Sequence, residues 1–172
     1  ALSTSLHEIK TDLLDKATAI LDMVIERFGT YAKYLESSMG KALTQDESNA
    51  FLREYIIKNR LEGKVKIRWT DMNTGGKTST SGPANMPEKR THTVWISTRA
   101  KTVMTEFGIQ AFAAHEVGTH MVRSLNDAHQ AWAVDRKQFN LGALGTRQSI
   151  RTEEGIATIH TAMHQQHTFL WN

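Results

Sequence analysis

The sequence has no cysteine, only two prolines and no apolar run long enough to cross a membrane. The absence of cysteine excludes disulfide bonds and cysteine-type zinc sites, and it allows a reducing compartment without proving one. A membrane span needs roughly 20 consecutive apolar residues, and the N-terminus has no charged-then-apolar signal pattern. We therefore expect no membrane partner. Because the first residue is Ala1, we also expect a fragment or a processed chain.

The chain also has little excess charge of either sign. Its 21 Lys and Arg residues against 18 Asp and Glu residues give a net charge of +3 over 172 residues. This small excess is compatible with acidic partners, but nucleic-acid-binding proteins usually show a much stronger basic patch. We therefore predict no nucleic-acid partner. The length suits one core of sizeable volume, so we predict a single domain over residues 1–172.

Helical patterns begin at two capping boxes, in which a Ser or Thr precedes a Glu by three residues. The first capping box begins at Ser5, and an amphipathic stretch continues from it to Gly29. The second begins at Thr44 and opens a helix that we expect to end at Gly63. Glycine at these positions is a typical stop signal for a helix.

Residues 65–69 alternate between apolar and polar residues, which predicts a strand. We predict a second strand over residues 93–97. Between them, residues 70–91 are rich in Thr, Ser, Gly, Asn and Pro. We predict a long surface loop there, and loops of this length are often binding elements. The strand over residues 93–97 could pair with an extended peptide, as edge strands do in peptide recognition.

After the second strand, Ser97 or Thr98 can cap a long helix. Its apolar residues recur at steps of three and four and predict a buried stripe, formed by Val103, Phe107, Ala111, Ala114, Gly118, Met121 and Leu125. Residues 126–151 are irregular or only partly helical in pattern, and a last helix is predicted to begin near Thr152. Together these elements predict an α+β fold, mainly helical with a small antiparallel sheet.

This long helix carries the sequence AAHEVGTHMV, in which His115 and His120 stand five positions apart and Glu116 follows the first. On an ideal helix each residue turns about 100°, so this spacing separates the imidazoles by about 140°. One π-bulge would bring them onto one face, and such bulges are frequent at functional sites. Gly118 could relieve strain at a bulge or permit close packing. The pair alone supports a metal site and an ordinary helix equally well.

A metal site needs a third ligand, and the adjacent residues Glu153 and Glu154 are candidates. The alternative is a solvated first turn of the last helix, where the helix dipole favours acidic side chains. Helical phase places Glu153 on one face with His160, His164 and His167. That face could support the metal, form a separate weak site at His160 and His164, or simply be a solvated polar surface.

HEVGTH followed by TEEGIA resembles the family known for its QEGLA motif, whose eukaryotic branch contains the microtubule-associated tyrosine carboxypeptidases. The likeness covers roughly residues 90–165, and the two motifs are specific only in combination. It implies a zincin-like metallopeptidase domain in which zinc is held by His115, His120 and a downstream glutamate. The family motif places that glutamate immediately before a glycine, which corresponds to Glu154. Glu153 and His160 would then not bind the metal themselves but would support its ligands.

The chemistry expected of such a site is hydrolysis. Two imidazoles and one carboxylate leave a fourth zinc position for water, as in catalytic sites. Glu116 can accept the proton of that water and deliver it to the departing amine. The resemblance further implies the C-terminal tyrosine of α-tubulin as substrate, with microtubules as partner and a cytoplasmic, cytoskeleton-associated location. Two alternatives stay open: a peptidase of the same chemistry with another peptide substrate, and a non-catalytic metal-binding module.

Removal of a C-terminal residue requires recognition of a free carboxylate, which arginine performs best through paired hydrogen bonds. Arg123 lies one helical turn past His120, and Arg147 precedes the glutamate helix. Taken singly, each of these arginines is more typical of a surface charge than of a receptor. We choose Arg147 as the carboxylate receptor and Arg123 as the second candidate. Trp95 and Trp132 could line an aromatic pocket or fill the core.

Overall fold

The computed structural model describes residues 11–83, 86–142 and 147–164. These residues divide into two compact units, residues 1–37 and 38–172, and the boundary falls near the end of α2. The prediction of a single domain stays a prediction. The capping box at Ser5 lies outside the described residues.

The first unit consists of α1 (Thr11–Phe28) and most of α2 (Tyr31–Met39). Gly29 has a φ of +78° and ends α1 at the predicted position, because the left-handed conformation favours glycine. The rings of Phe28 and Tyr34 lie 5.3 Å apart, edge to face, and connect the two helices within this unit.

The second unit begins with α3 (Gln45–Lys58), whose capping box is confirmed. The Thr44 hydroxyl accepts from the Glu47 amide at 3.2 Å, and the Glu47 carboxylate accepts from the Thr44 amide at 2.7 Å. The predicted end at Gly63 is wrong, because a Schellman motif ends the helix earlier: Arg60 is left-handed, with a φ of 59°. In this motif the Leu61 amide donates to the Ile56 carbonyl at 2.9 Å.

The sheet contains β1 (Val65–Thr70), β2 (Gly76–Ser81) and β3 (Thr91–Ser97) in the order β1–β3–β2. Both predicted strands and the α+β fold class are confirmed. The sheet is mixed rather than wholly antiparallel, because β1 is parallel to β3 and β2 is antiparallel to it. Since β3 is paired on both edges, the prediction that this strand receives a peptide is wrong.

β2 lies inside the segment that was predicted to be a loop, so that prediction is wrong for residues 76–81. The strand reads Gly-Lys-Thr-Ser-Thr-Ser and has no apolar residue, so it gives no alternating signal. Its place depends on packing: a Cβ atom at Gly76 would lie 2.3 Å from the Phe112 ring. A short 3₁₀ helix, η1 (Pro87–Lys89), follows before β3.

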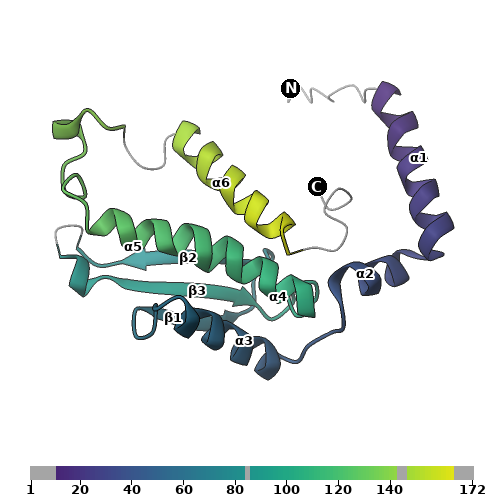
Figure 1. Ribbon diagram of the computed structural model, residues 1–172, viewed down its shortest axis with the longest axis horizontal. Helices are drawn as coiled ribbons and strands as arrows, with labels where there is room; N and C mark the ends of the chain where they lie inside the picture. Colours follow the sequence, from purple (N-terminus) through teal and green to yellow (C-terminus); the bar gives the residue numbers. More distant parts are fainter. Residues whose placement is uncertain (1–10, 84–85, 143–146, 165–172) are drawn as a thin grey trace, which may run out of the picture. The chain divides into compact units, whose positions relative to one another are not determined.

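The central helix is continuous and runs through α4 (Glu106–Phe112), the π-helix η2 (Ala113–Met121) and α5 (Val122–Ala128) (Figure 1). It begins at Thr105, whose hydroxyl accepts from the Gly108 amide at 3.1 Å. The prediction of Ser97 or Thr98 as the cap is wrong. The Ser97 hydroxyl instead donates to the Met72 carbonyl at 2.7 Å, in the connection between β1 and β2, and accepts from the Arg99 amide at 3.1 Å.

The core joins α3, β3 and the central helix, and its buried members include Leu52, Ile56, Leu61, Val94, Ile96, Ile109, Phe112, Ala113, Val117 and Met121. The predicted buried stripe of the central helix agrees with the structure only in part. Ala111, Ala114 and Met121 are buried, but Val117 rather than Gly118 is in the core. The reason is the wide turn of η2, which changes the phase of the helix relative to a regular α-helix.

The last described helix, α6 (Arg147–Ala162), packs across η2 (Figure 1). It is already helical at Arg147, so the predicted start near Thr152 is wrong and Glu153 does not lie in a first turn. Residues 126–151 include the end of α5 and the short η3 (Lys137–Phe139), in agreement with a partly helical segment. In the part of the chain that the structure describes, no helix is both long and apolar enough to span a bilayer.

Candidate metal centre

The two histidines of the central helix lie on one face because the helix is a π-helix between them. η2 extends over nine residues and includes both His115 and His120. Their Nε2 atoms are 3.3 Å apart, and their ring centroids are 5.0 Å apart. An α-helix would separate them by about 140°. The predicted wide turn is therefore confirmed, as a longer π-helical run rather than a single bulge.

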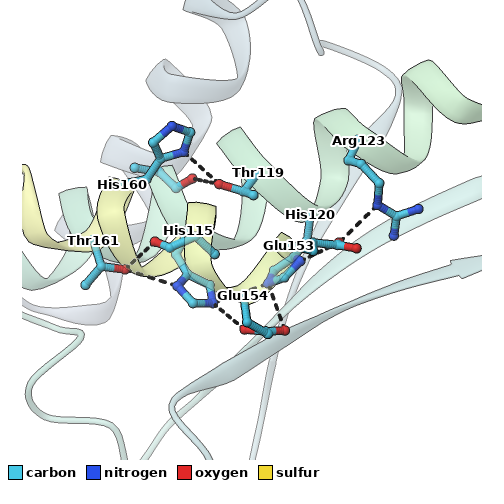
Figure 2. A network of polar contacts seen from close by, with 10 residues as sticks. His115, Thr119, His120, Arg123, Glu153, Glu154, His160 and Thr161 are labelled. Carbon is cyan, nitrogen blue, oxygen red and sulfur yellow. Dashed lines mark hydrogen bonds and ion pairs between the residues drawn. The ribbon is translucent and has the colours of Figure 1, made fainter. Parts of the chain in front are cut away.

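α6 contributes a carboxylate to the same point (Figure 2). Glu154 places Oε1 3.5 Å from His120 Nε2 and Oε2 3.8 Å from His115 Nε2. Ligands about 2.1 Å from one tetrahedral zinc ion lie about 3.4 Å from one another, close to the three separations found here. Within the described ranges, these three residues are the group whose donor atoms are close enough to hold one metal ion.

The protonation of His115 is fixed by a threonine on α6. The Thr161 hydroxyl donates its proton to the Ala157 carbonyl at 3.0 Å. It must therefore accept from His115 Nδ1, which lies 3.0 Å away. With the proton on Nδ1, the lone pair of Nε2 points toward Glu154 and His120, as a metal ligand requires.

His120 is oriented in the same way by a carboxylate. Its Nδ1 donates to Glu153 Oε1 at 2.7 Å, and Arg123 Nε donates to the same oxygen at 3.0 Å. The Glu153 side chain is 20% exposed and that of Glu154 is 54% exposed. The two adjacent glutamates thus have different positions: Glu154 faces the imidazole Nε2 atoms, whereas Glu153 lies behind His120. Sequence spacing alone could not distinguish them.

His160 does not contact either imidazole nitrogen of the cluster. Its Nδ1 lies 2.7 Å from the Thr119 hydroxyl, which in turn donates to the Ala114 carbonyl at 3.1 Å. His160 therefore connects α6 to the wide turn of η2 rather than supporting a metal ligand directly. His164 is described but is not part of the three-residue group, and His167 lies outside the described residues.

Gly118 is explained by close packing. A Cβ atom at this position would lie 2.6 Å from the hydroxyl of Tyr55, which comes from α3. Glycine here therefore lets Tyr55 approach the backbone of the π-helix. Of the two reasons considered for this glycine, packing is the one with a visible partner.

Glu116 lies in a cavity of about 260 Å³ beside His115, lined also by Met39, Phe112 and Thr161. Burial raises the pKa of Glu116 above its ordinary value; His120 opposes this shift and Glu154 adds to it. A carboxyl group with a raised pKa beside a candidate metal site suits proton transfer.

The electrostatic environment also favours neutral histidine. Burial lowers the pKa of His115, and the neighbouring His120 lowers it further, whereas Glu154 raises it. A neutral imidazole has the lone pair that a metal ion requires, so the shift agrees with the hydrogen-bond pattern.

A second cavity, of about 380 Å³, lies between β2 and the central helix and is lined by His120, Arg90 and Arg123 together with Thr78, Thr80 and Ser124. Arg90 is a candidate that sequence reasoning missed; its only signal was a basic residue three positions before the strand predicted over residues 93–97. Arg147 is exposed at the start of α6, about 10 Å of helix rise before Glu154.

The two candidate tryptophans lie elsewhere. Trp95 belongs to β3 and donates through Nε1 to the Ser79 hydroxyl at 2.8 Å. Trp132 packs edge to face on Phe139 at 6.5 Å and lines a different cavity, between α5 and α6. Among the described residues, neither tryptophan lines the cavities that contain His115 or His120 of the candidate metal-binding cluster (His115, His120 and Glu154).

No family model matches the chain. It is 28% identical over 166 residues to a human protein named microtubule-associated tyrosine carboxypeptidase 1, covering 95% of this chain and 32% of that protein. The rat protein of the same name is 27% identical over 167 residues, covering 96% and 33%. A mouse protein named putative tyrosine carboxypeptidase MATCAP2 is 25% identical over 162 residues, covering 92% and 28%.

The chain resembles the microtubule-associated tyrosine carboxypeptidases. The similarity extends over nearly all of its residues, so it includes the sheet, the central helix and α6. The chain spans about a third of the length of these relatives.

Proposed function

We propose that this chain contains the catalytic centre of a zinc-dependent carboxypeptidase. The observation that supports this most strongly is the convergence of His115 Nε2, His120 Nε2 and the Glu154 carboxylate, with a glutamate beside them. Nitrogen and oxygen donors at these separations suit zinc, and both histidines have their Nδ1 protons committed elsewhere. Three protein ligands rather than four leave a position for a reactant.

A zinc ion held by these residues would lower the pKa of a water molecule and polarise the scissile carbonyl. The remaining work belongs to the chain itself. Glu116 accepts a proton from the attacking water and transfers it to the departing amine. Thr161 and Glu153 hold the two imidazoles in their ligand tautomers, and Arg123 holds Glu153.

The substrate's free carboxylate requires a cation close to the metal. The cavity beside His120 is lined by Arg90 and Arg123 and by no acidic side chain of the described residues. Arg123 is already paired with Glu153, whereas the hydrogen bond found for Arg90 uses only its Nε atom, toward the Pro83 carbonyl at 3.2 Å. We therefore propose Arg90 as the main carboxylate receptor, with Arg123 beside it; Arg147 stays a prediction.

The names of the relatives support a narrower proposal: removal of a C-terminal tyrosine, with microtubules as partner and the cytoskeleton as location. Within it, the substrate that we propose is the α-tubulin tail. β2 is the edge strand next to η2, and Thr78 and Thr80 of this strand line the same cavity as His120. A peptide that extends along this edge reaches the metal-binding cluster with its last residue near Arg90.

The test is mass spectrometry of α-tubulin and of synthetic tail peptides after incubation with the chain. We expect loss of one terminal tyrosine, abolished by chelation and reduced by at least about a hundredfold in Glu116→Gln. Arg90→Gln should raise KM for the peptide acid but have little effect on the same peptide as a C-terminal amide. Equal activity of Glu116→Gln and the unchanged chain would refute the assigned base. Removal of any terminal residue at similar rates would refute tyrosine specificity.

A further inference from the structure

The positive charge of this chain is concentrated in its sheet segment. Residues 64–99 contain seven Lys and Arg residues against two Asp and Glu residues, whereas all other residues contain 14 against 16. The net charge of +3 for the whole chain therefore conceals a basic segment in a slightly acidic remainder. This segment comprises the three strands and their connections.

The strand pattern places the cations on one face. In β1, Val65 and Ile67 are partly buried against the core, so Lys66 and Arg68 project from the opposite face. The register places Lys66 beside Thr93, and Arg68 and Lys77 on either side of Trp95. A row of Arg68, Trp95 and Lys77 thus crosses the whole sheet.

These cations are not covered by any described element. Lys66, Arg68 and Lys77 are all exposed, whereas the core residues of β3 contact the helices on the other face. Of the two acidic residues in the segment, Asp71 is ion-paired with Arg99. Trp95 is partly exposed, and its Nε1 donates to Ser79, so the indole is held at the surface of the sheet.

The basic face continues to the edge of β1. A cavity of about 400 Å³ lies along this edge and is lined by Arg53, Lys66 and Arg68, together with Ile57 and Glu62. Among the described residues β1 pairs only with β3, so its other edge has backbone groups that an extended chain could bind.

We propose that this surface, the basic sheet face (Lys66, Arg68 and Lys77 around Trp95), is a docking surface for an acidic polypeptide. It is distinct from the metal-binding cluster, which lies on the helix side of the sheet. The two are connected through β2: Thr78 lines the cavity beside His120, and Lys77, next to it, projects to the basic face. An acidic substrate that crosses this edge strand can therefore contact both.

The occupant is polypeptide rather than nucleic acid for two reasons. Single-stranded nucleic acid is bound by several stacked aromatic side chains in a strongly basic groove, and this face has one partly buried tryptophan. An acidic peptide needs only well-spaced cations and an exposed strand edge. Naming this peptide as the substrate's own acidic segment rests on the proposed function; the docking itself does not require the metal.

The experiment measures binding of a labelled oligoglutamate peptide to the full chain by fluorescence anisotropy at low salt. We expect the triple variant Lys66→Gln, Arg68→Gln and Lys77→Gln to bind about tenfold more weakly, since each exposed ion pair contributes modestly. The same variant should hydrolyse a short neutral peptide ending in tyrosine at the unchanged rate. For an acidic tail peptide, its KM should rise while kcat stays constant.

The matched control is Lys16→Gln, Lys33→Gln and Lys137→Gln, which removes three exposed cations from other elements. Equal weakening in both triple variants would overturn the proposal, because the effect would then depend on net charge alone. The proposal would also be overturned in favour of nucleic acid by a different result. In that result the unchanged chain binds oligouridine tightly but does not bind oligoglutamate, and the first triple variant loses the oligouridine binding. If no variant has peptidase activity but oligoglutamate binding still depends on the basic sheet face, the docking surface stands and the proposed function fails.

Discussion

His115 and His120 present their Nε2 atoms to one point because each Nδ1 proton is already bound. Thr161 accepts one proton and Glu153 accepts the other, and both acceptors come from α6. The tautomers are thus determined by residues that are distant in sequence. No pattern in the sequence could have shown this, although the ligand residues themselves were predicted from HEVGTH and TEEG.

Removal of the carboxylate behind His120 should weaken metal binding. We predict that Glu153→Ala lowers zinc affinity about tenfold to a hundredfold, because His120 loses the acceptor that fixes its tautomer. Chelator competition on the purified chain measures this. The control is Glu54→Ala, an exposed carboxylate on α3, which should leave zinc affinity unchanged. Equal affinities in the two variants would contradict the assigned position of Glu153.

The close packing of Gly118 on Tyr55 can be tested, because we expect the effect of Gly118→Ala on stability to change sign when the Tyr55 hydroxyl is removed. Gly118→Ala should destabilise the chain, because the new methyl group would meet the Tyr55 hydroxyl at 2.6 Å. In a Tyr55→Phe background the hydroxyl is absent, and the same substitution should stabilise by up to about 1 kcal/mol through helix propensity. Urea unfolding of the four chains measures both effects. Destabilisation of equal size in both backgrounds would argue instead for backbone strain at the π-helix.

At the scale of elements, sequence reasoning succeeded where periodicity is strong and failed where packing decides. The capping box at Thr44 and the strands β1 and β3 have clear local signals. β2 has no apolar residue, so its strand character comes from pairing with β3 and from Phe112 packing on Gly76. The π-helix was expected only because a metal site required it. Its length of nine residues has no signal in the sequence.

The wide turn is connected to α6 by a threonine hydroxyl as well as by the hydrogen bonds of His115 and His120. Thr119 bridges the Ala114 carbonyl and His160, so Thr119→Val should cost about 1–3 kcal/mol of unfolding free energy and also lower zinc affinity. Calorimetry with and without zinc separates the two effects. Thr152→Val, which removes an exposed hydroxyl bond to the Gln148 carbonyl on α6, serves as the control. A Thr119 variant that loses stability but keeps full zinc affinity would show that the bridge does not align Glu154.

β3 contains a buried titratable residue that makes stability depend on pH. Burial lowers the pKa of His92 in the fold, and Arg90 adds to the shift. The unfolded chain then binds more protons, so stability should be full above about pH 6.5 and should fall as the pH drops below that value. His92→Gln should reduce this slope in chemical unfolding measured across pH. An unchanged slope would mean that the pKa of His92 is the same in the folded and the unfolded chain.

In the molecule as a whole, the candidate metal centre and the proposed docking surface lie on opposite faces of the sheet, and both include residues of β2. The helix side holds the metal-binding cluster, and the opposite face of the same strands has the exposed cations. The composition shows only the small net charge. It does not show that the exposed cations lie on the face of the sheet opposite the candidate metal centre. The similarity to tyrosine carboxypeptidases extends over nearly the whole chain but over about a third of the relatives.

Metal analysis of the purified chain tests the central claim most directly. We predict one zinc ion per chain by mass spectrometry under native conditions, and its loss in His115→Ala, His120→Ala and Glu154→Ala, each with retained helical signal. Glu116→Gln should keep the zinc. A chain without stoichiometric zinc, or one that retains zinc in the three ligand variants, would contradict the account.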